Sequence, residues 1–374
     1  MSLTTQLYNG EIGRWCAEHL QTGSAIAHVQ RQLIMAGSPE PVRPVGKVNA
    51  RHWADVGGAF GARLALLVDG APPYYALLGA VRAGLASRRW SEAMHTEFRT
   101  HRETPGSAQG RWSQYRPGRR GWIDIGERIE SGEPTEHEPV LSDFVRRTAA
   151  LIDEHMPPGR IGAPGAESSL ARSCWVIAGW ETSYREGRLP ADLAAVHSHP
   201  DYTAADLRRV VREPVLAELV DLVRVLHTRK TVQTWRGAGH RPDQGPLGIS
   251  GPVFVPHWAD GDLIVGDTLL DVKTAIRVDN PDSLSRWLWQ ILCYAWLDVQ
   301  DMYEIRSVGL YLARHGVTAS WGIDAFESSL LGGSGRATEA REDFLRIARR
   351  VIRDEGAHPP GAWRPRRKDT LHGH

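Results

Sequence analysis

The feature that most constrains this fold is a change in the spacing of its hydrophobic residues near position 250. Upstream, apolar residues recur at intervals of three to four, which is typical of amphipathic helices. Downstream, they gather in short runs bounded by Gly, Pro and Asp, which is typical of strands. The order of elements after this point therefore predicts an α/β protein. Strands are expected at 253–255, 262–265 and 268–273, a helix at 283–300, and strands at 305–314 and 317–323.

The part of the chain before position 250 is expected to be a large, mainly helical region. Helices are predicted at 6–33, 52–68, 74–85, 141–154, 168–186 and 203–228. Shifts in composition divide the whole chain into five expected units. These are an N-terminal helical region (1–87), charged linker or loops (88–140), a helical region (141–250), a core with the strands (251–330), and a C-terminal helix with a basic tail (331–374).

Composition sets broad limits on location and partners. The chain has 374 residues, 41% of them hydrophobic, and a formal net charge of only +1, so any basic surface for nucleic acid must be local. Its three cysteines are far apart, which argues against a disulfide scaffold and fits a reducing cytoplasm. No apolar run reaches the ~18 residues of a membrane span, and the N-terminus has no secretory pattern. We therefore expect a cytoplasmic protein without membrane contact.

One stretch of the chain is both basic and aromatic. Between Arg82 and Asp124, arginines outnumber acids, and Trp and Tyr residues are interleaved among them. This composition is typical of segments that bind nucleic acid strands. The alternative is a pair of solvated loops, because an acidic segment follows at 124–138. Arg119, Arg120 and the tail 364–368 are the candidate basic contacts.

Three ionisable residues are expected to meet at one end of a hairpin. Gly266-Asp267 predicts a two-residue turn between the strands 262–265 and 268–273, which places Asp262 opposite Asp271. Because residues two apart in a strand point to the same face, Asp271 and Lys273 project together. The other side chains of the hairpin are apolar, and burying charges beside them is costly unless they pair or bind a metal. The cluster is therefore a candidate site.

This trio suits the hydrolysis of phosphodiesters. Two aspartates offer hard oxygen ligands for Mg²⁺, or for Mn²⁺ in its place, and the metal retains several waters. A lysine beside the metal can orient a water for attack or help to deprotonate it. The charge that develops on phosphate oxygens would be stabilised by the same ion.

These residues, with two on the following helix, resemble the PD-(D/E)XK nuclease superfamily and its RecB-like exonuclease branch. Asp262, then Asp271-Val272-Lys273, then Gln290 and Tyr294 one helical turn apart, occur in the family's order. The resemblance covers 251–326. It implies a restriction-endonuclease-like core, a mixed sheet flanked by helices. It also implies that Asp262, Asp271 and the carbonyl of Val272 bind the metal, that Lys273 orients the water, and that Gln290 and Tyr294 contact the strand or brace the site.

The sequence departs from the family pattern in three places. The hairpin is short, and Ala259 stands where the family usually has glycine. Many RecB-like members add an acid or histidine from an upstream helix, and Gly57-Gly58 faintly resembles the opening of that helix without supplying an acid. Glu181 is a possible substitute.

The expected function is Mg²⁺-dependent hydrolysis of DNA. The analogy with other RecB-like domains suggests a role in phage defence or mobile-element biology. A protein partner from the same multi-gene system is also expected. Alternatives are an RNase, because the trio does not read the sugar, and a catalytically idle nucleic-acid-binding or assembly module that kept the fold. At the level of residues, Asp271 and Lys273 could form a surface salt bridge, and Tyr294 could simply belong to a buried stripe with Gln290 exposed. His197 and His199 are expected in a loop rather than in a metal site.

Overall fold

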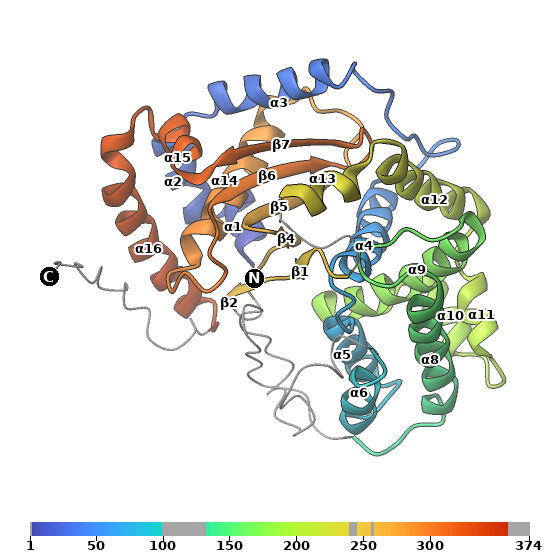
Figure 1. Cartoon of the computed structure of the whole chain (residues 1–374). Coiled ribbons are helices and arrows are strands. Elements are labelled where there is room, and N and C mark those ends of the chain that lie inside the picture. The colour runs from blue at the N-terminus through green and yellow to red at the C-terminus, as the bar shows by residue number, and fades with distance from the viewer. Residues whose placement is uncertain (1, 99–131, 239–244, 256–257, 358–374) are drawn as a thin grey trace, which may run out of the picture.

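The computed structural model describes residues 2–98, 132–238, 245–255 and 258–357. Within these ranges the protein is α/β, with a mixed five-stranded sheet and many helices (Figure 1). The helical region before the sheet contains α4 (Ala50–Val68), α5 (Tyr74–Arg82), α6 (Arg88–His95), α8 (Glu138–His155), α9 (Pro164–Glu186), α10 (Ala191–His197), α11 (Ala204–Arg209), α12 (Glu213–Thr228) and α13 (Thr231–Ala238).

The larger sheet has the strand order β1-β4-β5-β6-β7. The bounds are β1 (Gly248–Ser250), β4 (Leu263–Val265), β5 (Thr268–Lys273), β6 (Ser307–Leu312) and β7 (Val317–Gly322). β5 and β6 are parallel, whereas the other pairs are antiparallel. A parallel pair needs a crossover connection, and α14 (Pro281–Leu297) lies in the segment that joins β5 to β6. A second sheet pairs β2 (Val253–Val255) with β3 (Ala259–Asp260).

Both faces of β5 are buried, because helices cover the sheet on each side. Leu269 belongs to a hydrophobic cluster with α14, and the next residue, Leu270, belongs to another cluster with α4 and α12. Successive strand residues point to opposite faces, so β5 lies between two helical layers. The first cluster also contains residues of α1 (Leu3–Asn9), α2 (Glu11–His19), α3 (Gly23–Met35) and α16 (Ala337–Asp354).

The structure differs from the sequence predictions at several boundaries. Segment 6–33 forms three helices rather than one, and 203–228 forms two, because Pro214 occupies the first turn of α12 and starts a new helix. The segment 235–251, which is rich in Gly and Pro, contains the end of α13 and all of β1, and neither element was predicted. α10 and α15 (Ile323–Leu331) were not expected either.

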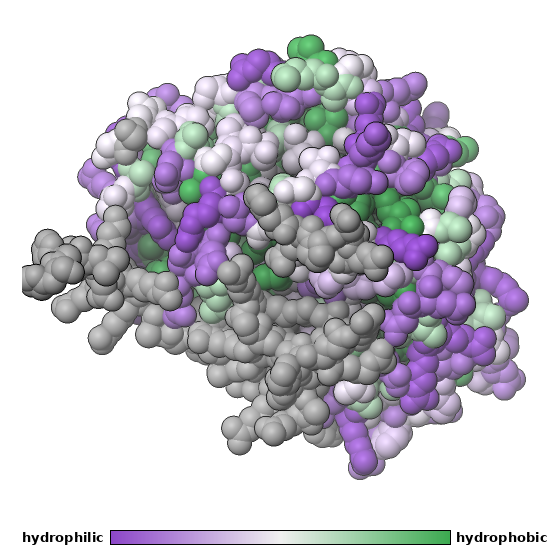
Figure 2. Space-filling view, in the orientation of Figure 1, coloured by the Kyte–Doolittle hydropathy of each residue, from purple (hydrophilic) through white to green (hydrophobic). Residues whose placement is uncertain are grey.

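Polar residues dominate the described surface over α8, whereas a hydrophobic patch lies over α3 at the upper edge (Figure 2). Ile34 and Met35, at the end of α3, are 68% and 79% exposed. No helix among the described residues is long and apolar enough to cross a membrane.

Candidate functional site

The hairpin of β4 and β5 brings Asp262 beside Asp271. The strands pair Leu263 with Leu270 and turn at Gly266, whose φ of +64° is the conformation that glycine tolerates best. Asp262 directly precedes β4, so the same register places it opposite Asp271. The backbone N–H of Val272 donates to Asp262 Oδ2 at 2.6 Å, which fixes the position of this carboxylate.

Asp271 and Lys273 lie on the same face of β5, as the two-residue period predicts. Lys273 Nζ is 2.6 Å from Asp271 Oδ2. The Asp271 side chain is only 4% exposed and that of Lys273 16%. The pair is therefore partly withdrawn from water and is no ordinary surface salt bridge.

Gln290 and Tyr294 on α14 complete the predicted group. Gln290 Oε1 accepts a hydrogen bond from Lys273 Nζ at 3.0 Å, and Gln290 Nε2 donates to the Tyr294 hydroxyl at 3.0 Å. The Tyr294 ring is buried and stacks on Phe254, with centroids 5.3 Å apart. Gln290 thus contacts the lysine directly, and Tyr294 supports Gln290. Nε2 of Gln290 also donates to Thr4 Oγ1 at 3.2 Å, which ties α14 to α1.

A pocket of about 500 Å³ opens over this group. It is lined by Asp262, Asp271, Lys273 and Gln290 on one side and by the helices α4, α5 and α9 on the other. The α4 wall is made of small residues, Gly57, Gly58 and Gly61 among them. A Cβ at Gly61 would meet nothing within 4 Å, so the glycine there leaves open space. Gly57 and Gly58, which faintly resemble the opening of the upstream helix in RecB-like proteins, thus lie in a wall of the pocket.

The surroundings of Asp262 and Asp271 disfavour the ionised form of both carboxyl groups. Loss of solvation, followed by the charge of Asp271, raises the pKa of Asp262 to about 7. Asp262 is nevertheless an exposed residue, whereas Asp271 is buried. Burial likewise raises the pKa of Asp271, and the charge of Lys273 offsets this only in part. Such shifts are typical of sites that hold a cation or perform proton transfer.

Glu181, which the sequence alone could not place, lies in the wall of the same pocket. Its Oε1 accepts from Arg185 Nη2 at 2.7 Å, and the same nitrogen donates to Asp260 Oδ2 at 2.7 Å. The Glu181 carboxylate is therefore already paired with Arg185, which lies on the same helix. With Asp260 and Glu181, the lining contains four carboxylates against two cations, Arg185 and Lys273, which gives a formal charge of −2.

The donor set suits one hard divalent cation with few protein ligands. Among the described residues there is no group of three or more His, Cys, Asp or Glu that could hold a metal. Mg²⁺, however, is usually bound by one or two carboxylates together with waters and substrate phosphates. Asp262 and Asp271 supply those two carboxylates, and burial, the largest cause for each, raises the pKa of both.

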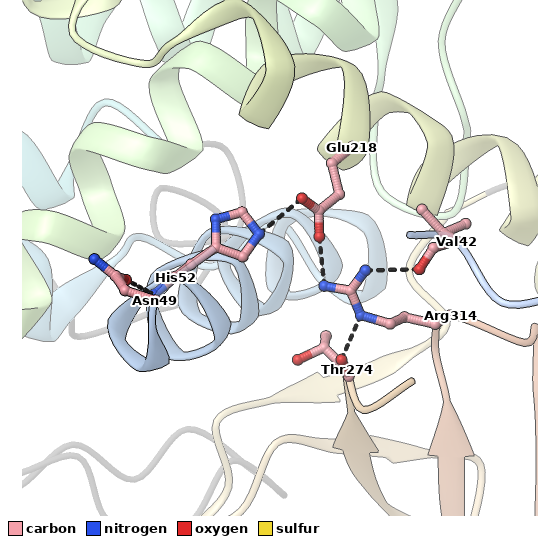
Figure 3. Close-up of polar contacts among 6 residues, drawn as sticks. All are labelled: Val42, Asn49, His52, Glu218, Thr274 and Arg314. Carbon is pink, nitrogen blue, oxygen red and sulfur yellow. Dashed lines mark hydrogen bonds and ion pairs between the residues drawn. The ribbon is translucent and has the colours of Figure 1, made fainter. Parts of the chain in front are cut away.

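A buried charged network adjoins the site, and no local pattern in the sequence predicts it. Arg314, fully buried after β6, donates from Nε to the Thr274 carbonyl at 2.5 Å and from Nη2 to Glu218 Oε1 at 2.5 Å (Figure 3). Glu218 Oε2 lies 2.8 Å from His52 Nε2. Arg314 Nη1 donates to the Val42 carbonyl at 2.8 Å. Since Thr274 directly follows Lys273, the network anchors the end of β5 to α4 and α12.

His197, by contrast, is the last residue of α10 rather than a loop residue. Its Nε2 lies 3.4 Å from Trp180 Nε1 in the helical core, and burial, together with the charge of His137, lowers its pKa to about 4. A packing role is therefore favoured over a metal pair with His199.

The basic residues proposed for nucleic-acid contact, Arg119, Arg120 and the tail 364–368, lie outside the described residues. Comparison with protein-family models, with curated proteins and with solved structures finds no match to this chain. The function is therefore argued from the site itself.

Proposed function

We propose that this protein is a metal-dependent nuclease of the PD-(D/E)XK kind that hydrolyses DNA phosphodiester bonds, with Mg²⁺ or Mn²⁺ bound by Asp262 and Asp271. One observation carries the proposal. Two carboxylates with raised pKa values and a lysine converge at one end of a hairpin, inside a pocket of about 500 Å³.

The protein's own residues supply positioning. Asp262 is fixed by the N–H of Val272, and Lys273 is held between Asp271 and Gln290, so its ammonium has one preferred direction. A bound metal ion would activate a water and stabilise charge on the phosphate. Lys273, as an ammonium, would orient that water by donating a hydrogen bond to it, and its positive charge would stabilise the hydroxide formed when the water loses its proton to solvent.

The fold is compatible with this chemistry. A mixed sheet with helices on both faces, and a crossover helix that carries Gln290 between the two parallel strands, supports the assignment to a restriction-endonuclease-like core. The carbonyl of Val272 is proposed as a third ligand. The N–H of Val272 donates to Asp262, so the backbone of this residue lies beside the proposed metal ligands.

The charge of the pocket favours an enzyme over an idle binding module. A lining of −2 repels a phosphodiester unless a cation intervenes. A module that only bound nucleic acid would bind more tightly if Asp271 were neutral, because the buried carboxylate is itself costly. A site that holds a metal ion has a reason to keep both aspartates.

The test is cleavage of linear, circular and single-stranded DNA, and of RNA, with Mg²⁺, Mn²⁺ or EDTA. Asp271→Asn and Lys273→Met should abolish metal-dependent cutting. Asp267→Asn, at the exposed turn of the same hairpin, is the matched control and should cut like the unmodified chain. Preference for RNA would replace DNA as the substrate. Binding without cutting on any substrate would favour the idle module.

A further inference from the structure

A second pocket, of about 310 Å³, lies beside the first between α4 and α9. The two pockets share four lining residues, Ala54, Gly58, Ala178 and Thr182. A Cβ at Gly58 would lie 3.4 Å from Ala178 Cβ, so the two helices are in contact at this point. None of the four shared side chains is larger than threonine, so only small side chains lie between the two pockets at these positions.

The lining of the second pocket is rich in groups that bind nucleotides. Arg51 and Arg212 supply guanidinium groups, and Trp175 supplies a half-buried indole whose Nε1 donates to Asp192 Oδ2 at 3.3 Å. Arg51 is 41% exposed and lies 3.5 Å from Asp55. Arginine suits phosphate by its planar fork of donors, and an indole suits a nucleobase by stacking.

The two pockets differ in charge. In the second, Arg51 and Arg212 balance Asp55 and Asp192, so its formal charge, with His52 neutral, is zero rather than −2. Burial raises the pKa of Asp55, and the charge of Arg51 offsets this only in part. By formal charge, the second pocket therefore repels a phosphate less than the first pocket does.

We propose that the second pocket binds a further nucleotide of the strand that is cut in the first, with its phosphate at Arg212 and Arg51 and its base against Trp175. This inference rests on the proposed nuclease function and names its substrate more closely. A pocket of about 310 Å³ is closer in size to one nucleotide than to a base pair, which favours a strand that is single where it passes α4 and α9. The substrate is then a single strand, or a frayed end, that is long enough to span both pockets.

The experiment measures the affinity of the full chain for fluorescent single-stranded oligonucleotides of about 2 to 16 nucleotides, the range of single-strand site sizes. Ca²⁺ replaces Mg²⁺ so that the strands stay intact. Affinity should rise stepwise once the strand reaches the second pocket. Arg212→Glu should remove that step, with a loss of about tenfold for long strands and none for the shortest. Trp175→Leu should lower the affinity for long strands that carry all their bases. It should leave the affinity for a strand with an abasic segment unchanged.

Arg224→Glu is the matched control, because Arg224 lies on α12, the helix that Arg212 caps, is 68% exposed and lines neither pocket. Equal losses for short and long strands, or losses no larger than those of Arg224→Glu, would overturn the second site while leaving the nuclease intact. An unmodified chain that neither binds any strand nor cuts one with Mg²⁺ would overturn the proposed function and this inference together.

Discussion

Lys273 and Gln290 are joined by a hydrogen bond of 3.0 Å from the lysine Nζ to the glutamine Oε1, which links the last residue of β5 to the middle of α14. Because the same lysine contacts Asp271, the amide acts as a second brace on the ammonium. The position of Lys273 therefore depends on the crossover helix as well as on its own strand.

Gln290→Ala should reduce kcat while leaving KM nearly unchanged. Lys273 would lose one of its two partners and spend less time in the position that orients the attacking water. A decrease in kcat of about tenfold or more is therefore expected. Steady-state kinetics with Mg²⁺ provide the measurement. Asp282→Asn, on the exposed first turn of the same helix, is the control and should have no effect. A rise in KM with constant kcat would instead assign Gln290 to substrate binding.

Asp271→Asn should make the metal-free protein more stable at about pH 8, by a few degrees in Tm. The folded-state pKa of Asp271 is raised, so the folded state holds its proton more tightly than the unfolded chain. Stability from this group is therefore complete at low pH and is lost as pH rises through the folded-state pKa. The neutral amide avoids that loss, and the gain should shrink toward pH 4. Thermal melts in EDTA across this range would show it, and a lower Tm at every pH would contradict it.

Stabilisation by Mg²⁺ should depend on pH through Asp262. Its pKa is raised to about 7, and only the ionised carboxylate binds the metal. Binding therefore competes with a proton below about pH 7, and affinity should fall by up to about tenfold per pH unit there. The rise in Tm produced by saturating Mg²⁺ should be clearly larger at about pH 8 than at about pH 6. Asp262→Asn should abolish the rise at both values, whereas a rise independent of pH would exclude Asp262 as a ligand.

Glu218→Ala should strongly destabilise the protein, by about 3–5 kcal/mol, because it leaves the buried guanidinium of Arg314 without its carboxylate. Urea denaturation at neutral pH gives the free energy of unfolding. The double variant Glu218→Leu with Arg314→Met, which removes both charges, should recover part of the loss. If the single variant costs no more than about 1 kcal/mol, the network does not anchor the strand as inferred.

The local features of the site could be predicted from the sequence. The Gly266-Asp267 turn and the two-residue period of β5 place Asp262, Asp271 and Lys273 together, and both signals span only a few residues. Gln290 and Tyr294 share one helical face for the same reason, and they do bond to each other. The expected α/β class is confirmed by the mixed sheet and its helices.

The rest of the site depends on contacts between distant segments, which periodicity does not report. Arg314 and Val42 are 272 positions apart, and no local pattern marks either residue as a partner. Periodicity likewise does not predict that Gly57 and Gly61 line a pocket, because glycines inside a helix have the same spacing whether they face a pocket or solvent. Only the faint resemblance of Gly57-Gly58 to the family drew attention to this helix. β1 was missed because its three residues adjoin a Gly- and Pro-rich segment and become a strand only by pairing with β4.

The packing of α1, α2 and α3 has a consequence for the order of folding. Leu3, Ile12 and Val29 are buried in the same cluster as Leu288 and Phe344, which lie far from them in the sequence. Contacts between such distant segments form slowly, because a long loop has to close before the contact stabilises it. The cluster on this face of β5 is therefore expected to assemble late in folding, and Gln290, which bonds to Thr4 of α1, reaches its final position with it.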